Sequence, residues 1–276
     1  MLRFAGIQMM SGTDKAENLL HATELVSKAA EAGARLVSLP ECFNSPYSTE
    51  LFHQYAETIP DGETTLHLKN LARKKEIFLI GGTIPELCDG KIYNTCLVFN
   101  PDGEIIAKYR KLHLADIDIP GKITFKESDT ISPGHEFTVF KVDSFNVGLG
   151  ICYDLRFPEL PHMLRLKGAH VIIYPGLYNP TTGPRVFELL TRARAVDNQV
   201  YCCSNSSAVD TTSCYVSWGH SLVVAPTGEV IVAAESDETI IYADMDMKLI
   251  EDARAAIPTW TQKRNDMYVV KEVKED

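Results

Sequence analysis

Runs of consecutive apolar residues alternate with stretches of helical period along the first half of the chain. A short apolar run bounded by turn residues predicts a buried strand, whereas apolar positions three and four residues apart predict an amphipathic helix. These patterns predict strands over Phe4–Gln8, Arg35–Leu39 and Ile77–Ile80, a hairpin over Cys96–Tyr109, and helices over Ala16–Ala32 and Thr64–Lys75. The predicted order is β-α-β-α-β-β-β.

Residues at the ends of these elements support the boundaries. Asp14 stands at the N-cap of the first predicted helix, Glu17 follows three residues later, and Gly33 comes directly after the last turn. The segment Pro101-Asp102-Gly103 supplies the turn of the hairpin.

The second half repeats the same order of elements. Its patterns predict strands over Asn146–Ile151, Val171–Tyr174 and Val200–Asn205, a hairpin over Ser221–Ala234, and helices over Pro158–Lys167 and Arg185–Asn198. The turn sequence Pro226–Val230 resembles Pro101–Ile105 of the first half. Strands that alternate with amphipathic helices place the helices on the outer faces of sheets. The sequence therefore predicts a layered α/β architecture of two similar halves.

No linker of biased composition separates the two halves, so we expect one domain over residues 1–276. Residues 261–276 are charged and lack a strong period, which predicts a tail over the surface or over a neighbouring subunit. The chain begins with a predicted strand, and no run approaches the roughly 18 apolar residues of a membrane span. We expect an unsecreted, cytoplasmic protein.

Composition and charge restrict the class of partner. The 276 residues include 27 Lys or Arg and 37 Asp or Glu, which gives a net charge of −10 and disfavours binding to nucleic acid. The seven cysteines form no C-x-x-C pair, so reduced thiols are expected rather than disulfides or a zinc site. The eight histidines show no metal-ligand spacing. The expected partner is a small molecule, without a metal or an organic cofactor.

Three reactive side chains stand at the ends of predicted strands, where active groups of α/β proteins gather. They are Glu41, Lys111 and Cys152. A thiol becomes a good nucleophile when a nearby base such as Glu41 removes its proton. Lys111 and the backbone N–H of Tyr153 would stabilise the oxyanion of a tetrahedral intermediate, and Glu127 would hold Lys111 and pass protons to the leaving amine.

Position alone leaves simpler interpretations open. A cysteine that ends an apolar strand is more often a core residue, and charged residues after strands are usually solvated. Arg156 either pairs with Glu159 at the start of a helix or faces a substrate carboxylate. We interpret His113 as a residue behind the reacting groups rather than as the partner of the thiol.

Three segments, taken together, identify a family. Pro40-Glu41-x-Phe43, Tyr109-Arg110-Lys111-x-His113-Leu114 and Gly150–Glu159 resemble, in order, the three signature segments of the nitrilase or carbon–nitrogen hydrolase superfamily. Gly6-Ile7-Gln8 and Arg192–Asn198 extend the resemblance over nearly the whole chain.

The resemblance implies an αββα sandwich of two pseudo-symmetric halves that pairs into a homodimer, with the helix after Cys152 near the interface. It also implies amide or nitrile hydrolysis through a thioester. Cys152 would then be the nucleophile, Glu41 the base, Lys111 the oxyanion stabiliser and Glu127 the auxiliary acid.

Within the superfamily, Pro40–Tyr47 and Asp116–Phe125 resemble the omega-amidase branch, which hydrolyses the side-chain amides of 2-oxoglutaramate and 2-oxosuccinamate. Tyr47, Arg156 and Tyr178 are candidates to bind the far end of such a substrate. Where relatives usually read Thr-Gly-Pro-x-His-Trp, this chain has Thr182–Phe187, which changes a wall near the expected pocket.

Two alternative functions stay open at this point. One is another amidase of the superfamily, such as one that acts on deaminated glutathione. The other is a non-catalytic dimeric binding or scaffold protein that keeps the fold.

Overall fold

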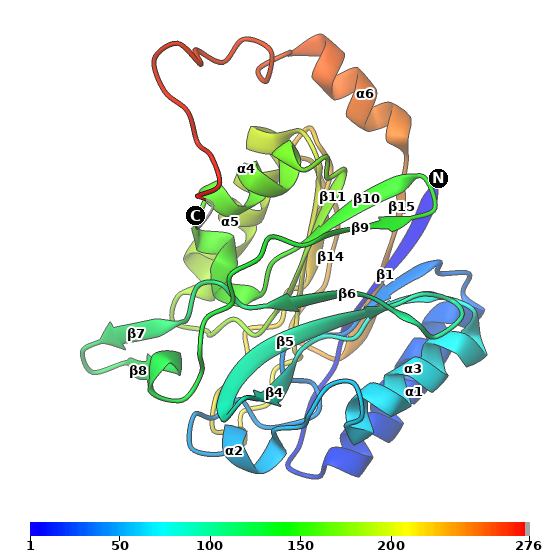
Figure 1. Cartoon of the computed structure of the whole chain (residues 1–276), viewed down its shortest axis with the longest axis vertical. Coiled ribbons are helices and arrows are strands. Elements are labelled where there is room, and N and C mark those ends of the chain that lie inside the picture. The colour runs from blue at the N-terminus through cyan, green and yellow to red at the C-terminus, as the bar shows by residue number, and fades with distance from the viewer. Residues whose placement is uncertain (274–276) are drawn as a thin grey trace.

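The computed structural model describes residues 1–273, and two β-sheets packed face to face form its centre (Figure 1). The helices α1 (Lys15–Glu31) and α3 (Glu63–Lys75) cover the outer face of the first sheet. The helices α4 (Glu159–Leu166) and α5 (Gly183–Asn198) cover the outer face of the second sheet. The predicted four-layer αββα sandwich is confirmed.

The first sheet is built mainly by the first half of the chain. Strands β1, β2 and β3 run parallel, β5 joins them antiparallel, and β4 and β6 flank β5. The bounds in the sheet are β15 (Thr239–Met245), β1 (Leu2–Gln8), β2 (Leu36–Ser38), β3 (Phe78–Ile80), β5 (Lys91–Phe99), β4 (Ile84–Cys88) and β6 (Ile105–Arg110).

The second sheet repeats this arrangement. Strands β10, β11 and β12 run parallel, and the antiparallel hairpin of β13 and β14 follows β12. In the first sheet, β5 and β6 follow β3 in the same way. The bounds are β9 (Val139–Val142), β10 (Phe145–Leu149), β11 (Val171–Gly176), β12 (Tyr201–Ser206), β13 (Leu222–Val224) and β14 (Val230–Ala233). Antiparallel strands flank both parallel sets, β15 beside β1 and β9 beside β10. The two predicted halves are thus two copies of one topology.

Neighbouring residues of the inner strands pack into two different hydrophobic cores. On β1, Phe4 packs into the layer between the sheets, whereas Ala5 and Ile7 pack under the helices. Leu36 and Val37 of β2 divide in the same way. Side chains alternate across a strand, so a strand buried on both faces reads as a continuous apolar run, as the sequence did.

Several elements lie outside the predicted pattern. The strands β4, β9 and β15, the hairpin of β7 (Asp116–Ile119) and β8 (Ile123–Lys126), and the helices α2 (Phe52–Tyr55) and α6 (Met247–Ala256) were not among the expected elements. The hairpin β7–β8 is partly exposed and carries polar residues between apolar ones, so it lacks a continuous apolar run.

After α6 the chain returns over the second helical layer, including the described part of the expected tail at 261–273 (Figure 1). Trp260 stacks on His162 of α4 with ring centroids 4.8 Å apart, and the Nζ atom of Lys167 lies 2.9 Å from Oε2 of Glu272. Residues 274–276 of the tail lie outside the described residues. Within residues 1–273, none of the helices combines the length and the apolar composition needed to cross a membrane.

Asp14 should contribute measurably to stability because it caps α1. Its Oδ1 accepts hydrogen bonds from the backbone N–H groups of Ala16 and Glu17, at 2.8 and 3.1 Å. Asp14→Ala is expected to lower the free energy of unfolding by about 1 kcal/mol, measured by urea denaturation. Glu24→Ala, on the exposed face of the same helix, is the control and should change it by less than about 0.5 kcal/mol. Equal effects of the two substitutions would contradict the capping role.

Candidate active site

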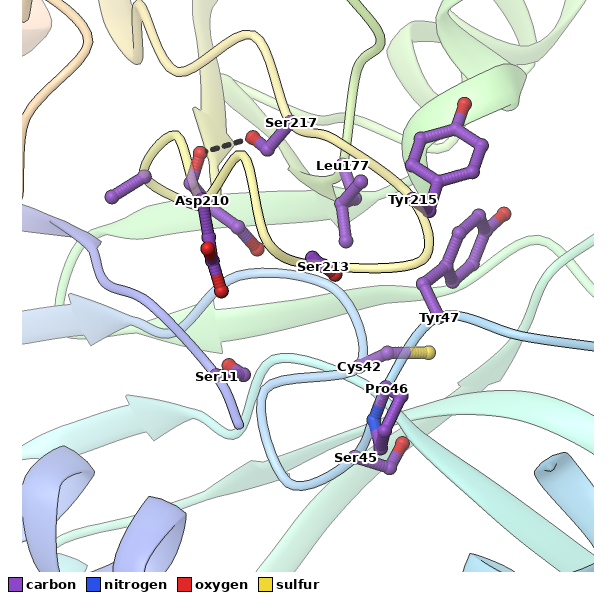
Figure 2. Close-up of a pocket in the computed structure, with 12 residues that line it drawn as sticks. Ser11, Cys42, Ser45, Pro46, Tyr47, Leu177, Asp210, Ser213, Tyr215 and Ser217 are labelled. Atoms are coloured by element: carbon purple, nitrogen blue, oxygen red, sulfur yellow. Dashed lines mark hydrogen bonds between the residues drawn. The ribbon is translucent and has the colours of Figure 1, made fainter. Parts of the chain in front are cut away.

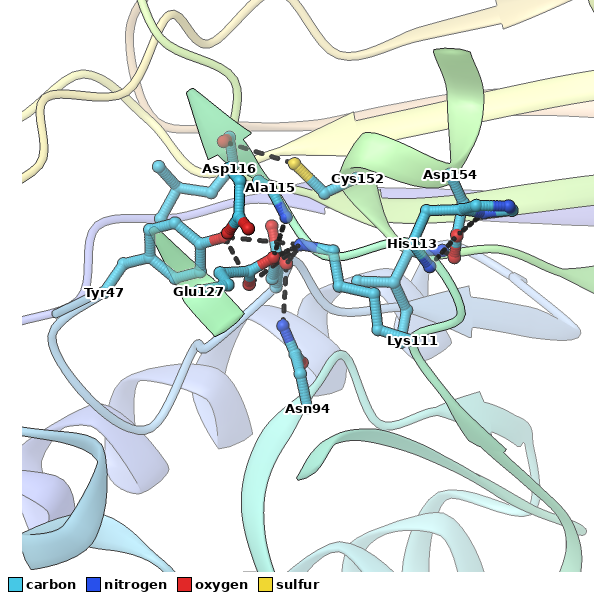
Figure 3. Close-up of polar contacts among 12 residues, drawn as sticks. Tyr47, Asn94, Lys111, His113, Ala115, Asp116, Glu127, Cys152 and Asp154 are labelled. Carbon is cyan, nitrogen blue, oxygen red and sulfur yellow. Dashed lines mark hydrogen bonds and ion pairs between the residues drawn. The ribbon is translucent and has the colours of Figure 1, made fainter. Parts of the chain in front are cut away.

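A lysine and two glutamates form an ion cluster in the interior of the protein (Figure 3). The Nζ atom of Lys111 lies 2.8 Å from Oε1 of Glu41 and 2.9 Å from Oε2 of Glu127, and all three side chains are fully buried. Removing a charged group from water costs several kcal/mol, so buried charges need opposite charges and hydrogen bonds around them. The structure brings these three predicted residues together from separate segments of the chain.

Backbone and amide groups hold the ion cluster in place. Lys111 follows β6, and its backbone N–H donates to the carbonyl oxygen of Asn94 on β5 at 2.9 Å. The side chain of Asn94 donates to Oε1 of Glu41 at 2.8 Å, so one residue fixes both partners. Glu127 begins the short helix η1 (Glu127–Asp129), and the N–H of Ala115 donates to its Oε2 at 2.6 Å. Asn94 lies inside a strand, and no sequence signal indicated its role.

Tyr47 is part of this cluster. Its hydroxyl donates to Oε1 of Glu127 at 2.7 Å and accepts from Nζ of Lys111 at 3.3 Å. The rings of Phe125 and Tyr215 pack against the Tyr47 ring, each with centroids 4.9 Å from it. Tyr47 therefore stands between the charged groups and an aromatic wall.

Cys152 approaches the cluster from the second sheet. It follows the end of β10 and opens the short helix η2 (Cys152–Arg156), with a left-handed backbone angle φ of 43° that is rare for a residue with a side chain. Gly150 makes room for this turn, because a Cβ atom there would lie 2.4 Å from the ring of Tyr174. The Sγ atom lies 3.5 Å from the carbonyl oxygen of Leu177. The thiol is also close enough to Glu41 for the carboxylate charge to act on its pKa.

Asp154 connects the turn of Cys152 to the segment of Lys111. Its fully buried carboxylate accepts from the hydroxyl of Tyr109 at 2.7 Å, from the backbone N–H of Ile151 at 2.9 Å and from the backbone N–H of His113 at 3.0 Å. Nδ1 of His113 lies 2.7 Å from the same carboxylate, as expected for a residue behind the reacting groups. Our sequence reasoning missed Asp154, although a carboxylate two residues after the thiol in an apolar segment was a usable signal.

Burial and neighbouring charges determine the protonation states of the site. Burial raises the pKa of the Cys152 thiol well above its ordinary value, the charge of Glu41 raises it further, and the charge of Lys111 opposes both. Burial also raises the pKa of Glu41, with Lys111 acting against it and Glu127 adding to it. For Lys111, burial favours a lower pKa, but the charges of Glu127 and Glu41 outweigh it and the pKa is raised. The resting site thus contains a fixed ammonium and a protonated thiol beside a carboxyl group.

This arrangement suits covalent acyl transfer. A protonated thiol needs a base to become a nucleophile, and a fixed positive charge in a dry site stabilises a developing oxyanion. No group of three His, Cys, Asp or Glu side chains within residues 1–273 is arranged to hold a metal ion.

The three predicted substrate contacts lie in different surroundings. The hydroxyl of Tyr178 donates to the carbonyl oxygen of Cys152 at 3.2 Å, and its ring packs on Phe187 with centroids 4.0 Å apart. The departure at Thr182–Phe187 therefore reaches the site through Tyr178. Arg156 makes no ion pair with Glu159; its guanidinium lies 5.5 Å from the ring of Tyr153. Tyr47 lines a small pocket beside the cluster (Figure 2).

Comparisons with known proteins agree with the geometry. Residues 3–255 match the carbon–nitrogen hydrolase family. The omega-amidase NIT2 of Bos taurus is 53% identical over 268 residues, which cover 97% of each chain, and that of Homo sapiens is 52% identical over 268 residues with the same coverage. The crystal structure of Saccharomyces cerevisiae Nit3, a member of branch 10 of the nitrilase superfamily, superposes with a TM-score of 0.88 at 44% identity, covering 95% of this chain and 96% of that one.

The opposing charges around Cys152 give a test of the geometry that does not depend on activity. Glu41→Gln removes the charge that raises the thiol pKa, so the midpoint of Cys152 alkylation by iodoacetamide against pH is expected to fall. Lys111→Met removes the charge that lowers this pKa, so the midpoint should rise. Peptide mapping of the labelled protein reports both. A midpoint that neither substitution moves would place the thiol away from the cluster.

Proposed function

The chain belongs to the carbon–nitrogen hydrolase family, and from this premise we propose that it is an omega-amidase-type hydrolase. Its substrates are 2-oxo dicarboxylic acid monoamides, namely 2-oxoglutaramate and 2-oxosuccinamate, which it converts to the dicarboxylate and ammonia. The observation that carries the proposal is the fully buried pairing of Lys111 with Glu41 and Glu127 beside the Cys152 thiol. The omega-amidase names of relatives about half identical over nearly the full chain support the substrate class.

The first half-reaction forms a thioester. Glu41 accepts the thiol proton through Oε2, which has no hydrogen-bond partner in the cluster, and the Cys152 sulfur attacks the amide carbon. Lys111 and the backbone N–H of Tyr153 stabilise the oxyanion. Collapse of this intermediate breaks the carbon–nitrogen bond, and the leaving nitrogen takes up the proton that Glu41 had accepted and departs as ammonia. Glu127 keeps Lys111 charged and in place, and serves as the auxiliary acid.

The second half-reaction hydrolyses the thioester. Glu41, ionised again, removes a proton from water as the water oxygen attacks the thioester carbon. The carbon–sulfur bond then breaks, and the thiol is regenerated as the dicarboxylate leaves. These steps use only side chains of this chain, its backbone and water.

Binding of the substrate carboxylate requires hydrogen-bond donors or a cation, because a desolvated carboxylate must be paired. We assign this role to Arg156 and Tyr178, which flank the turn of Cys152. Support for Arg156 comes from its free guanidinium, which has no ion-pair partner among the described residues. Tyr47 contributes mainly through its contact with Lys111 and Glu127.

The proposal extends to assembly and location. We expect residues 1–276 to act as one domain that pairs into a homodimer, with α4 near the interface, in the cytoplasm. The net charge of −10 supports a small-molecule substrate and no association with nucleic acid.

Two other functions are compatible with the same fold. A second amidase activity, on deaminated glutathione, would use the same reacting residues and differ in the acyl pocket, where Phe187 contacts Tyr178. A non-catalytic scaffold has no physical need for a buried lysine between two glutamates beside a thiol, since such an arrangement is costly to bury.

An ammonia-release screen tests the substrate class. The purified protein is expected to release ammonia fastest from 2-oxoglutaramate and 2-oxosuccinamate, and more slowly from deaminated glutathione, glutamine, asparagine and a simple nitrile. Cys152→Ala is the control for each substrate and should be inactive. Faster turnover of deaminated glutathione would favour the second amidase, and equal ammonia release by Cys152→Ala would favour the scaffold.

Substitutions in the cluster should affect turnover to different extents. Glu41→Gln removes the base for both half-reactions, so kcat should fall by about 10²-fold or more. Lys111→Ala removes an oxyanion contact and should lower kcat on the order of 10²-fold. Steady-state kinetics on 2-oxoglutaramate measures both, and circular dichroism checks the fold. Near-normal turnover of Glu41→Gln would remove Glu41 from the mechanism.

A further inference from the structure

A small pocket lies beside the ion cluster and contains several serine hydroxyls. We call it the serine pocket and define it by Ser11, Ser45 and Ser207, together with Cys42, Tyr47 and Leu177 of its lining (Figure 2). Its volume is about 20 Å³. One buried water molecule needs roughly 10–15 Å³ of cavity volume. The serine pocket therefore holds one or two water molecules and excludes a dicarboxylic acyl chain.

Three hydroxyls of the serine pocket have no hydrogen-bond partner in the part of the chain that the structure describes. The side-chain oxygens of Ser11, Ser45 and Ser207 are buried and unpaired among the described residues, and Ser45 and Ser207 are only 2% and 5% exposed. Buried polar atoms are nearly always paired, because an unpaired one loses its bonds to water without replacement. An ordered buried water needs two to four polar partners. Three unpaired hydroxyls in the lining of one pocket supply that number of polar partners.

The serine pocket adjoins each part of the reacting site. Cys42 is the peptide neighbour of Glu41, the hydroxyl of Tyr47 contacts Lys111 at 3.3 Å, and the carbonyl oxygen of Leu177 lies 3.5 Å from Sγ of Cys152. Glu41, Lys111 and Cys152 do not line the serine pocket themselves, and each is separated from it by one of these lining residues.

The outer side of the serine pocket leads to solvent. Ser11, Pro46, Asp210 and Ser213 line both the serine pocket and a larger cleft beyond it. One carboxylate, Asp210, and no lysine or arginine line the serine pocket within the described residues. The negative charge of Asp210 repels the carboxylate end of the substrate and does not repel a neutral water molecule.

We propose that the serine pocket holds and resupplies the water molecule that cleaves the thioester. The inference rests on the proposed function, because it concerns the second half-reaction of the same site. The oxygen of the water forms a bond to the thioester carbon while its proton passes to Glu41. The carbon–sulfur bond breaks, the electron pair stays on sulfur, and the proton on Glu41 returns to the thiolate. Ser11, Ser45 and Ser207 hold the water before it moves to the thioester, and they take no part in the bond changes.

Filling the serine pocket separates this role from acylation. Ser207→Val adds carbon atoms to a space that holds one or two waters. With p-nitrophenyl acetate, release of p-nitrophenolate reports acylation of Cys152, and intact-protein mass spectrometry follows loss of the acetyl group. We expect acylation at the wild-type rate, deacylation slowed about tenfold or more, and accumulation of the acetyl-enzyme.

Three further variants make the result specific. Ser45→Val fills the same space from a different segment of the chain and should also slow deacylation without slowing acylation. It provides the test if Ser207→Val does not fold. Ser207→Ala keeps the space and should slow deacylation less than Ser207→Val does. Ser144→Val, at an exposed serine in the turn between β9 and β10, should behave like the wild type.

The outcomes distinguish this inference from the substrate assignment. Wild-type deacylation in both valine variants would overturn the inference, and so would an equal slowing of acylation and deacylation. An activated ester acylates the thiol whatever the natural amide is. If the wild type forms and hydrolyses the acetyl-enzyme but releases no ammonia from 2-oxo acid amides, the proposed substrate is wrong and the test of the serine pocket still stands.

Discussion

The sharing of one buried ammonium between two carboxylates is the interaction on which the site depends. Loss of Lys111 would leave two buried carboxyl groups without the positive charge between them, which costs several kcal/mol. The surrounding groups follow from this constraint. Asn94, Ala115 and Tyr47 supply the hydrogen bonds that the two carboxylates need, and together they fix the positions of all three charged atoms. A cluster held in this way is already organised before any substrate binds.

The two-sheet architecture explains why the thiol meets this cluster. Glu41 and Lys111 follow strands of the first sheet, whereas Cys152 follows a strand of the second. Packing the sheets face to face directs both sets of strand ends to the same place, and Asp154 ties the two segments together through Tyr109 and His113. The site is thus a product of the packing between the two halves, and neither half contains it alone.

Much of this could be predicted from the sequence, for identifiable reasons. Continuous apolar runs and end signals such as Asp14 and Gly33 placed the central strands and the main helices, since these depend on local pattern. The partly exposed hairpin of β7 and β8 has no such run and was missed. The three signature segments indicated Glu41, Lys111 and Cys152, but Asn94 acts only through a contact between strands that local patterns do not encode. From the sequence, Arg156 could pair with Glu159 or face a substrate carboxylate. Only the packing of η2 placed its guanidinium near the ring of Tyr153.

The pairing of the first strand has a consequence for biosynthesis. Strand β1 lies between β2 and β15, so Leu2 is paired with Met245 near the other end of the chain. During synthesis, β1 has one unsatisfied edge until those late residues leave the ribosome, and an exposed edge of this kind invites pairing with other chains. Completion of the amino-terminal sheet is therefore delayed almost to the end of translation. Shortened products that lack β15 are expected to be clients of chaperones and proteases.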